Sequence, residues 1–187
     1  MGYAIAEAAI EAGHEVVLIS GPVDVDRPRG VAVIPVSTSD EMFEAVRRHT
    51  SRCDILVMCA AVADYRPATV YKSKIKKRGE NISLELVPTR DILASLPKDR
   101  AYLVVGFAAE TENLESNARK KLQEKNCDVI VANDARIGME SDENDVAILF
   151  RDGETKRISR APKTIISRDL VNIFENYSEK RLTKKIM

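Results

Sequence analysis

The run ILVMCAAVADYR at residues 55–66 decides the fold class of this chain. Its first four residues are apolar and predict a buried strand, and the small residues Ala60 and Ala61 follow closely. A carboxylate at Asp64 comes next, and a cationic segment lies beyond it at 72–77. Alanines at a strand end let a flat ligand approach the backbone, and the lysines can meet negative charge. This arrangement is typical of a nucleotide site.

Strands and helices alternate on both sides of this run. The apolar periodicity and the capping residues predict helices at 2–12, from Ser39 or Asp40 to about Thr50, at 112–125 and at 163–177. Strands are expected at 15–20, 31–36, 54–59, 102–107 and 128–132. This pattern predicts an α/β fold: a doubly wound, mostly parallel Rossmann-like sheet that binds ligands beyond the carboxyl ends of its strands.

Two segments fall outside the doubly wound pattern. Asp152-Gly153 separates the strand-like runs 145–150 and 154–158, which predicts an antiparallel hairpin at the edge of the sheet. Residues 82–87 also form a strand-like run, and such exposed edges need to be covered. The basic residues at 180–185 are expected to be a solvated tail.

Composition restricts the classes of function. The 187 residues suffice for one domain, and 29 basic against 29 acidic residues give a net charge of zero, which argues against a nucleic-acid binder. Cys53, Cys59 and Cys127 lack ligand-like spacing and adjoin apolar runs, so they are interpreted as small apolar residues of a reducing cytoplasm, not as disulfide, zinc or catalytic thiols. No apolar run approaches the length of about 18 residues that a membrane span needs.

Five motifs together resemble one family. AAVADYR at 60–66, KIKK at 74–77, RDIL at 90–93, GFAAET at 106–111 and AND at 132–134 occur in the order found in phosphopantothenoylcysteine synthetase. The resemblance covers nearly the whole chain. This family is the ligase of coenzyme A biosynthesis, is dimeric, and in bacteria is often fused behind a flavin-dependent decarboxylase.

The resemblance implies a CTP-dependent, magnesium-requiring ligase. Such an enzyme activates the carboxylate of 4'-phosphopantothenate as an acyl-cytidylate and releases pyrophosphate, and the amine of L-cysteine then expels CMP; ATP replaces CTP in eukaryotic members. Two alternatives stay open. One is an NAD(P)-dependent oxidoreductase, although the chain lacks Gly-x-Gly-x-x-Gly and any Tyr-x-x-x-Lys. The other is a nucleotide-binding module without complete catalysis.

Site residues follow from the resemblance. Lys74 would place its ammonium against the nucleotide phosphates as the catalytic residue, although a solvated lysine is the alternative. Asp64, ten residues earlier, would bind the nucleotide together with Ala60 and Ala61, or would simply form an Asx turn. No residue is assigned as a ligand of the protein to a metal.

The remaining nucleotide contacts come from three later motifs. Arg90, Asp91, Ile92 and Leu93 match the segment that surrounds the cytosine, but Arg90 replaces a proline that many members carry. Asp91 is either a nucleotide contact or a helix cap. Phe107 is either a nucleotide contact or a core residue. Lys121 and Lys125, fourteen and eighteen residues further on, match CTP-contacting positions but could also be solvated. Asn133 and Asp134 form either a turn or part of the substrate wall.

The sequence opens on a helix without a preceding strand. In the family that the chain resembles, a strand, a glycine turn and an Asn-x-Ser-Ser-Gly-Lys segment come before this helix. We therefore interpret residues 1–187 as a single nucleotide-binding ligase domain that lacks its first strand and loop. The expected consequence is weakened nucleotide binding with little complete conversion.

Overall fold

The structure, a computed structural model, describes residues 1–71, 73–77, 79, 81–134 and 142–186. The helices in these ranges are α1 (Gly2–Glu11), α2 (Ser39–His49), the 3-10 turn η1 (Thr50–Arg52), α3 (Leu114–Glu124) and α5 (Lys163–Ile186). The strands are β1 (Val17–Ser20), β2 (Ala32–Pro35), β3 (Ile55–Met58), β4 (Tyr65–Pro67), β5 (Leu86–Pro88), β6 (Leu103–Glu110), β7 (Val129–Asp134), β8 (Glu143–Phe150) and β9 (Thr155–Pro162). None of the helices in the described ranges combines the length and the apolar character that crossing a membrane requires.

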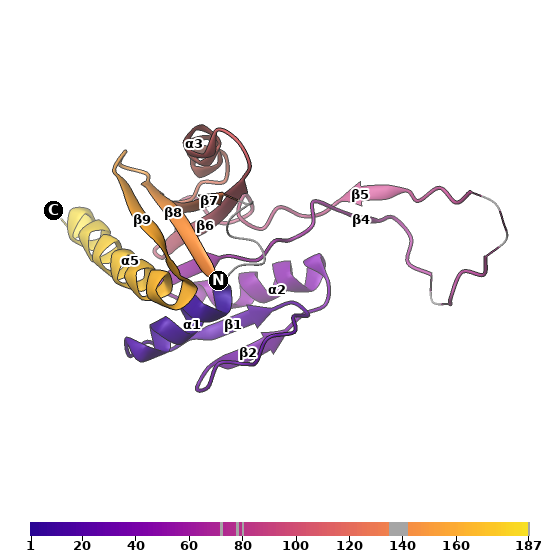
Figure 1. Cartoon of the computed structure of the whole chain (residues 1–187), viewed down its shortest axis with the longest axis horizontal. Coiled ribbons are helices and arrows are strands. Elements are labelled where there is room, and N and C mark those ends of the chain that lie inside the picture. Colours follow the sequence, from indigo (N-terminus) through magenta and orange to yellow (C-terminus); the bar gives the residue numbers. More distant parts are fainter. Residues whose placement is uncertain (72, 78, 80, 135–141, 187) are drawn as a thin grey trace.

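The central sheet has the strand order β3-β6-β7-β8-β9 (Figure 1). β3, β6 and β7 are parallel, with Met58 opposite Gly106 and Gly106 opposite Ile130. β8 and β9 continue the sheet as an antiparallel hairpin at its edge. The predicted doubly wound, mostly parallel sheet with an antiparallel edge hairpin is therefore confirmed.

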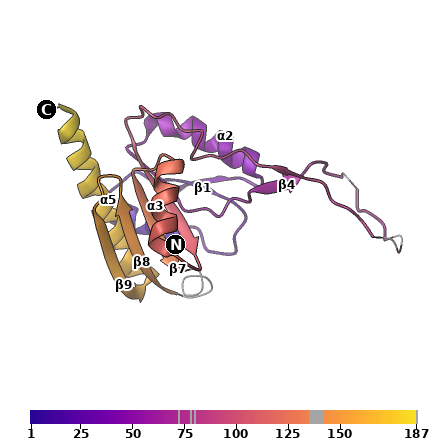
Figure 2. The ribbon, with the colours of Figure 1, turned by 90° about the horizontal axis from the view of Figure 1, so that it is seen from above.

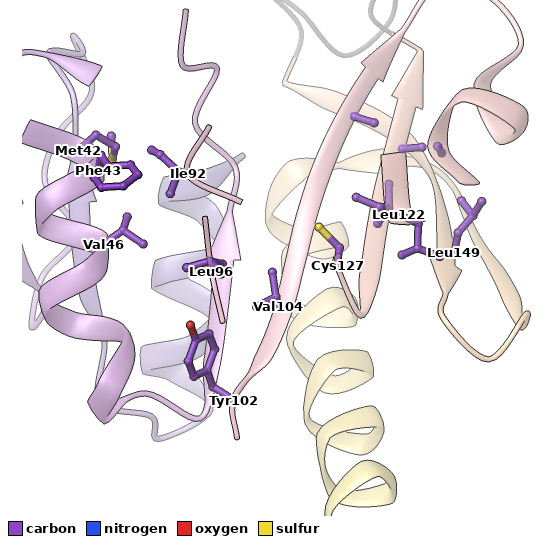
Figure 3. Packing of buried hydrophobic residues seen from close by; sticks show 14 of the residues in the cluster. Met42, Phe43, Val46, Ile92, Leu96, Tyr102, Val104, Leu122, Cys127 and Leu149 are labelled. Atoms are coloured by element: carbon purple, nitrogen blue, oxygen red, sulfur yellow. The ribbon is translucent and has the colours of Figure 1, made fainter. Parts of the chain in front are cut away.

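Helices cover both faces of this sheet because its strands are apolar on both faces. On one face, Phe43 and Val46 of α2 and Leu122 of α3 pack with Val104 of β6 (Figure 3). On the other face, α1 and α5 pack against the alternate residues of the strands, such as Val105. The carboxyl ends of β3, β6 and β7 lie together at one edge of the sheet.

β1 and β2 form a separate parallel sheet. The start of α1 nevertheless adjoins the carboxyl ends of both β1 and β3. Tyr3 Oη lies 2.9 Å from Ser20 Oγ at the end of β1, and a Cβ added to Gly2 would lie 3.6 Å from Cys59 Cβ just after β3. β1 and β3 therefore end at the same place without being partners in one sheet.

The described residues of the segment 64–88, which we call the arm, extend away from the body of the molecule (Figures 1 and 2). β4 and β5 pair antiparallel at its root, from Tyr65 opposite Pro88 to Pro67 opposite Leu86. The predicted strand over 82–87 is wrong for residues 82–85, since β5 begins only at Leu86. The reason is that the arm offers no sheet face on which the apolar side chains of this run can be buried.

Two further boundaries differ from the sequence-based expectation. The N-cap of α2 is Thr38, because its hydroxyl accepts from the backbone of Glu41 while the Glu41 carboxylate accepts from the backbone of Thr38, which makes a capping box. The predicted helix at 163–177 continues further, because α5 runs to Ile186 and includes the basic residues at 180–185 that were expected to form a tail. Arg181 helps to hold this last part of the helix, since it donates to the carbonyl oxygen of Tyr102 at 2.8 Å.

Candidate functional site

Two lysines near the end of α3 reach the sheet at the level where β3 ends, because Met58, the last residue of β3, lies opposite Gly106 of β6. Lys121 donates from Nζ to the carbonyl oxygen of Phe107 in β6 at 2.8 Å. Lys125, the residue that caps the end of α3, forms an ion pair with Asp91. The fold therefore brings Asp91, Phe107, Lys121 and Lys125 together from three separate segments, and we call these four residues the lysine site.

The charges of the lysine site support each other. The hydrogen bond to Asp91 raises the pKa of Lys125, and the carboxylates of Asp91 and Asp64 add further attraction. Burial disfavours the Asp91 carboxylate, but the Ala94 N–H at 3.0 Å and the Lys125 ammonium outweigh it and lower the pKa of Asp91. Asp64 is thus close enough to act electrostatically on Lys125. Both members of the Asp91–Lys125 pair are charged at neutral pH.

The segment after Asp91 is a compact turn with its side chains turned inward. Ile92 is buried and belongs to the core beneath α2, and Leu93 packs against the same core. The N–H of Ser95 donates to the Asp91 carbonyl at 3.1 Å. Because the side chains of Ile92 and Leu93 serve packing, recognition of a base by this segment would depend on its backbone, and that role stays a prediction.

Arg90 directs its side chain to α2. Its guanidinium lies 3.8 Å from the centre of the Phe43 ring, and its nitrogens lie 3.0 Å from Asp40 and 2.9 Å from Glu44. These bonds, led by the one to Glu44, raise the pKa of Arg90. The cation of Arg90 is therefore already paired within the protein, and its predicted nucleotide contact stays untested.

The segment that follows β3 runs over the surface to the arm. Ala60, Ala61 and Asp64 are all exposed, as close approach of a ligand to the backbone requires. Thr89 closes the segment from the other side, since its N–H donates to the Asp64 carbonyl at 2.8 Å and its hydroxyl to the Ala63 carbonyl at 2.7 Å. Among the described residues, none donates a hydrogen bond to the exposed Asp64 carboxylate, which leaves it accessible to a ligand.

Lys74 is exposed and lies in the arm. The segment 73–77 belongs to the outer part of the arm, far from α3 in both views (Figures 1 and 2). The structure therefore brings Asp64 near the lysine site but does not bring Lys74 there. The catalytic role of Lys74 stays a prediction.

Phe107 and Gly106 show how closely the sheet is packed behind the site. Phe107 is half-buried and packs against the core on the α1 and α5 face, in agreement with the alternative of a core residue. A Cβ added to Gly106 would lie 2.7 Å from Ile130 Cδ1 and 3.1 Å from Cys127 Sγ. A side chain at this position would force the Ile130 side chain to shift, so the glycine allows β6 to pack closely against Ile130 and Cys127.

A buried arginine, which the sequence did not single out, fixes the turn after Lys125. Arg100 is 5% exposed and donates to the Asp128 carboxylate at 2.9 Å and to the Asn126 carbonyl at 2.6 Å. Asp128 also accepts from the N–H of Val104 at 2.9 Å. No local pattern reveals this network, because its members lie more than twenty residues apart in the chain.

A hollow of about 490 Å³ lies between the start of α3 and the strands β7, β8 and β9. Asn113, Ala132 and Arg157 are among the residues that line it. The predicted wall residues Asn133 and Asp134 follow Ala132 directly, and they lie in β7 rather than in a turn. The four residues of the lysine site are not among those that line this hollow.

The cysteines and the acidic residues limit the possible chemistry. Cys53, Cys59 and Cys127 are free, and burial raises the pKa of Cys53 and of Cys127 to about 11. A thiol that is neutral at physiological pH is a poor nucleophile. In the described ranges, no three His, Cys, Asp or Glu side chains are grouped so that they could hold a metal ion.

Comparison with known proteins identifies relatives over almost the whole chain. Residues 1–177 match the family described as "DNA/pantothenate metabolism flavoprotein C-terminal domain". The Coenzyme A biosynthesis bifunctional protein CoaBC of Bacillus subtilis (strain 168) is 46% identical over 176 residues, which are 91% of this chain and 43% of that protein. CoaBC of Escherichia coli (strain K12) is 41% identical over 189 residues, covering 96% of this chain and 46% of that protein. The chain thus spans less than half the length of these relatives.

Solved structures agree in fold. The crystal structure of the C-terminal domain of CoaBC superposes with a TM-score of 0.81 at 38% identity, covering 95% of this chain and 82% of that one. A complex of a Cab2 mutant with phosphopantothenate-cysteine has a TM-score of 0.76 over 99% of this chain and 79% of that chain, but at 13% identity it shows the fold alone. The chain therefore belongs to the DNA/pantothenate metabolism flavoprotein C-terminal domain family, which confirms the resemblance to phosphopantothenoylcysteine synthetase.

Proposed function

We propose that this chain is the ligase part of a coenzyme A biosynthesis enzyme and joins 4'-phosphopantothenate to L-cysteine at the expense of CTP. The observation that carries the proposal is the lysine site beside the carboxyl end of β3, in a family whose relatives are named for coenzyme A biosynthesis. Open α/β sheets bind nucleotides at this edge. A flavin-dependent decarboxylase fused to or associated with the chain is part of the same proposal.

The reaction has two steps. A carboxylate oxygen of phosphopantothenate attacks the α-phosphorus of CTP, the bond to the β-phosphate breaks, and pyrophosphate leaves. The amine of cysteine then attacks the acyl carbon, loses a proton, and expels CMP. Both steps bring anions together, so the chain must contribute positive charge and fixed positions.

Lys121 and Lys125 are the first source of that charge. In the free protein they are held by the Phe107 carbonyl and by the Asp91 carboxylate, and these partners keep both ammonium groups at the sheet edge. Nucleotide phosphates would compete for the same donors. Asp64 is accessible and acts on Lys125, so it suits the ribose hydroxyls or the magnesium ion that accompanies a triphosphate.

Magnesium fits this site as a partner of the nucleotide. The ion is usually held by substrate phosphates, water and one or two carboxylates rather than by a cage of protein ligands. Asp64 supplies such a carboxylate, which agrees with the lack of a larger acidic cluster in the described ranges. Bound magnesium would neutralise phosphate charge, while the lysines orient the chain of phosphates.

Lys74 is the second source of charge in this proposal. Its ammonium would stabilise the phosphates as the acyl-cytidylate forms, and reaching them requires either movement of the arm or approach of the arm from another copy. We propose a homodimer, because the arm exposes large apolar side chains such as Val70, Ile82 and Leu84 (82%, 69% and 60%). A second copy could cover them and pair with the free edges of β4 and β5.

Titration calorimetry with CTP, ATP and NAD, each with magnesium, tests the proposal. CTP is expected to bind tightest. Addition of phosphopantothenate and cysteine to the protein with CTP is expected to release pyrophosphate from CTP. Lys125→Ala should weaken CTP binding about tenfold or more, whereas Lys120→Ala, a matched change at an exposed lysine of the same helix, should not. Tightest binding of NAD would favour the oxidoreductase. CTP binding without pyrophosphate release, also in a version extended by a strand and a loop before α1, would favour the non-catalytic module.

A further inference from the structure

One carboxylate of α2 holds both strands of the arm at its root. Asp40 lies 3.6 Å from Arg66 Nε and 3.0 Å from Arg90 Nε. Arg66 belongs to β4, and Arg90 follows the end of β5 by two residues. The same carboxylate therefore pairs with the outgoing strand β4 and with the segment that follows the returning strand β5.

Arg90 is held by more than a single ion pair. Its guanidinium also bonds to Glu44 at 2.9 Å, and the guanidinium carbon lies 3.8 Å from the centre of the Phe43 ring. Phe43 is 7% exposed and packed into the core, so it gives the arginine a fixed surface. Isolated surface ion pairs contribute little, but a network built on a rigid aromatic side chain defines a position. We call Asp40, Phe43 and Glu44 the α2 clamp.

The two arginines that the clamp holds are close neighbours of the carboxylates of the candidate site. Asp64 precedes Arg66 by two residues, and Asp91 follows Arg90 directly. The hydrogen bonds from Thr89 to the Ala63 and Asp64 carbonyls join the segment before Arg66 to the segment before Arg90. A shift of either arginine would therefore move a carboxylate that acts on Lys125.

We infer that Asp40 is a positioning residue for nucleotide binding: by holding Arg66 and Arg90 on α2 it sets where Asp64 and Asp91 stand relative to Lys125. This inference rests on the proposed function, because it assigns a consequence for nucleotide affinity. Asp40 itself touches neither lysine in this arrangement and acts through the arginines. Its effect is therefore local to the root of the arm and to the turn at 91–95.

Hydrogen exchange separates this role from general support of α2. Asp40→Asn keeps the shape of the side chain and removes its charge. Amides at 64–66, 86–87 and 89–91 are expected to exchange about fivefold faster, while those of β6 and β7 stay unchanged. Glu11→Gln is the matched control, because it removes an ion pair of similar exposure, between Glu11 and Arg168, far from the arm in the sequence.

Calorimetry supplies the functional readout. Asp40→Asn should weaken binding of CTP with magnesium about five- to tenfold, Asp40→Glu should restore most of the affinity, and Glu11→Gln should leave it unchanged. Asp40 also lies in the first turn of α2, where an acid favours the helix. For this reason Asp40→Asn is repeated in an Arg66→Gln, Arg90→Gln background, where its effect on affinity should nearly vanish.

The outcomes decide the inference independently of the reaction. Unchanged exchange at the arm root in Asp40→Asn would overturn it, and so would an increase spread over the whole of α2 and the sheet. If the parent protein bound no CTP, the proposed function would fail, yet the exchange result would still tell whether Asp40 holds the arm. An undiminished effect of Asp40→Asn in the double arginine background would assign the residue to the helix instead.

Discussion

Valine, isoleucine and leucine occur in both the central sheet and the arm, but their surroundings differ completely. In the sheet, Val104, Ile130 and Ile148 are fully buried. In the arm, Ile82 and Leu84 are more than half exposed. The same residue type therefore stabilises the fold in one region and offers a surface in the other. The sheet is stabilised by its own buried side chains. Within the described ranges the arm is held only at its root, and its apolar side chains are available for contact with another surface.

This difference assigns separate tasks to the two regions. The sheet places Phe107 and the α3 lysines with little freedom, because the strands and Gly106 are packed at van der Waals contact. The arm carries Lys74 outside this packing (Figure 1). Substitutions in the sheet should thus change stability first, and substitutions in the arm should change binding, turnover or assembly with little effect on stability.

The largest effect is expected from adding a strand between β1 and β3. β1 and β3 both end at the start of α1 but belong to separate sheets, so a parallel strand placed between them would end where α1 begins. A version extended by a strand and a loop that enter α1 in this way should gain protection from exchange in β1 and β3. It should also turn over faster by orders of magnitude, because backbone N–H groups of a loop at the start of a helix can hold phosphate. Equal rates for both versions would contradict this expectation.

The next effect compares matched side chains in the two regions. Ile148→Ala should lower the free energy of unfolding by about 2–5 kcal/mol, because the residue is fully buried and leaves a cavity. Ile82→Ala should change it by less than about 0.5 kcal/mol, because the side chain is exposed. Urea unfolding at a low protein concentration measures both. Similar losses for the two variants would show that the arm is packed in solution.

The sheet could be predicted from the sequence for a physical reason. Its strands are apolar runs whose period and length differ from those of the helices between them, and each run meets a partner that it can bury against. The same rule failed at 82–85, where an apolar run has no sheet face to cover and stays outside β5. The predicted end of the last helix, at residue 177, was also wrong. α5 continues beyond it, because Arg181 is held by the Tyr102 carbonyl, a contact across 79 residues of chain.

The candidate site was predictable only in part. The four-residue spacing of Lys121 and Lys125 placed them on one face of α3, and the fold added the partners Phe107 and Asp91. The side chain of Arg90 was not predictable, since its partners on α2 lie some fifty residues earlier in the chain. Contacts of this kind depend on tertiary structure alone, and no local pattern announces them.

Lys74→Ala tests the task assigned to the arm. The change should lower the rate of pyrophosphate release in the extended protein about 100-fold, because one charge aimed at the phosphates is lost. The melting temperature should stay the same, since Lys74 is exposed. Lys76→Ala is the matched control and should keep the parent rate. A Lys74→Ala variant within threefold of the parent would return Lys74 to the class of solvated lysines.

Assembly tests the exposed surface of the arm. Light scattering at micromolar concentration should report a dimer for the parent, and Leu84→Glu should weaken the dimer about tenfold or more, because a charge would be buried at the contact. Lys76→Glu, at an exposed polar position of the same arm, should weaken the dimer less. A parent that stays monomeric would leave the apolar side chains of the arm without the proposed partner.

The smallest effect concerns the pH dependence of the unfolding free energy that arises from Cys127, a buried thiol between α3 and β7. Burial raises the pKa of Cys127 to about 11, above that of an unfolded cysteine, so the native state keeps the thiol neutral where the unfolded chain ionises it. This contribution is complete below the unfolded pKa near 9 and is lost as the pH rises through the folded value. Between pH 8 and pH 10 the parent should lose about 1 kcal/mol more unfolding free energy than Cys127→Ala, in which this ionisation is removed. Parallel pH profiles for the two proteins would show that the thiol is solvated, and that the packing between Gly106 and the α3 turn is looser than in the rest of the sheet.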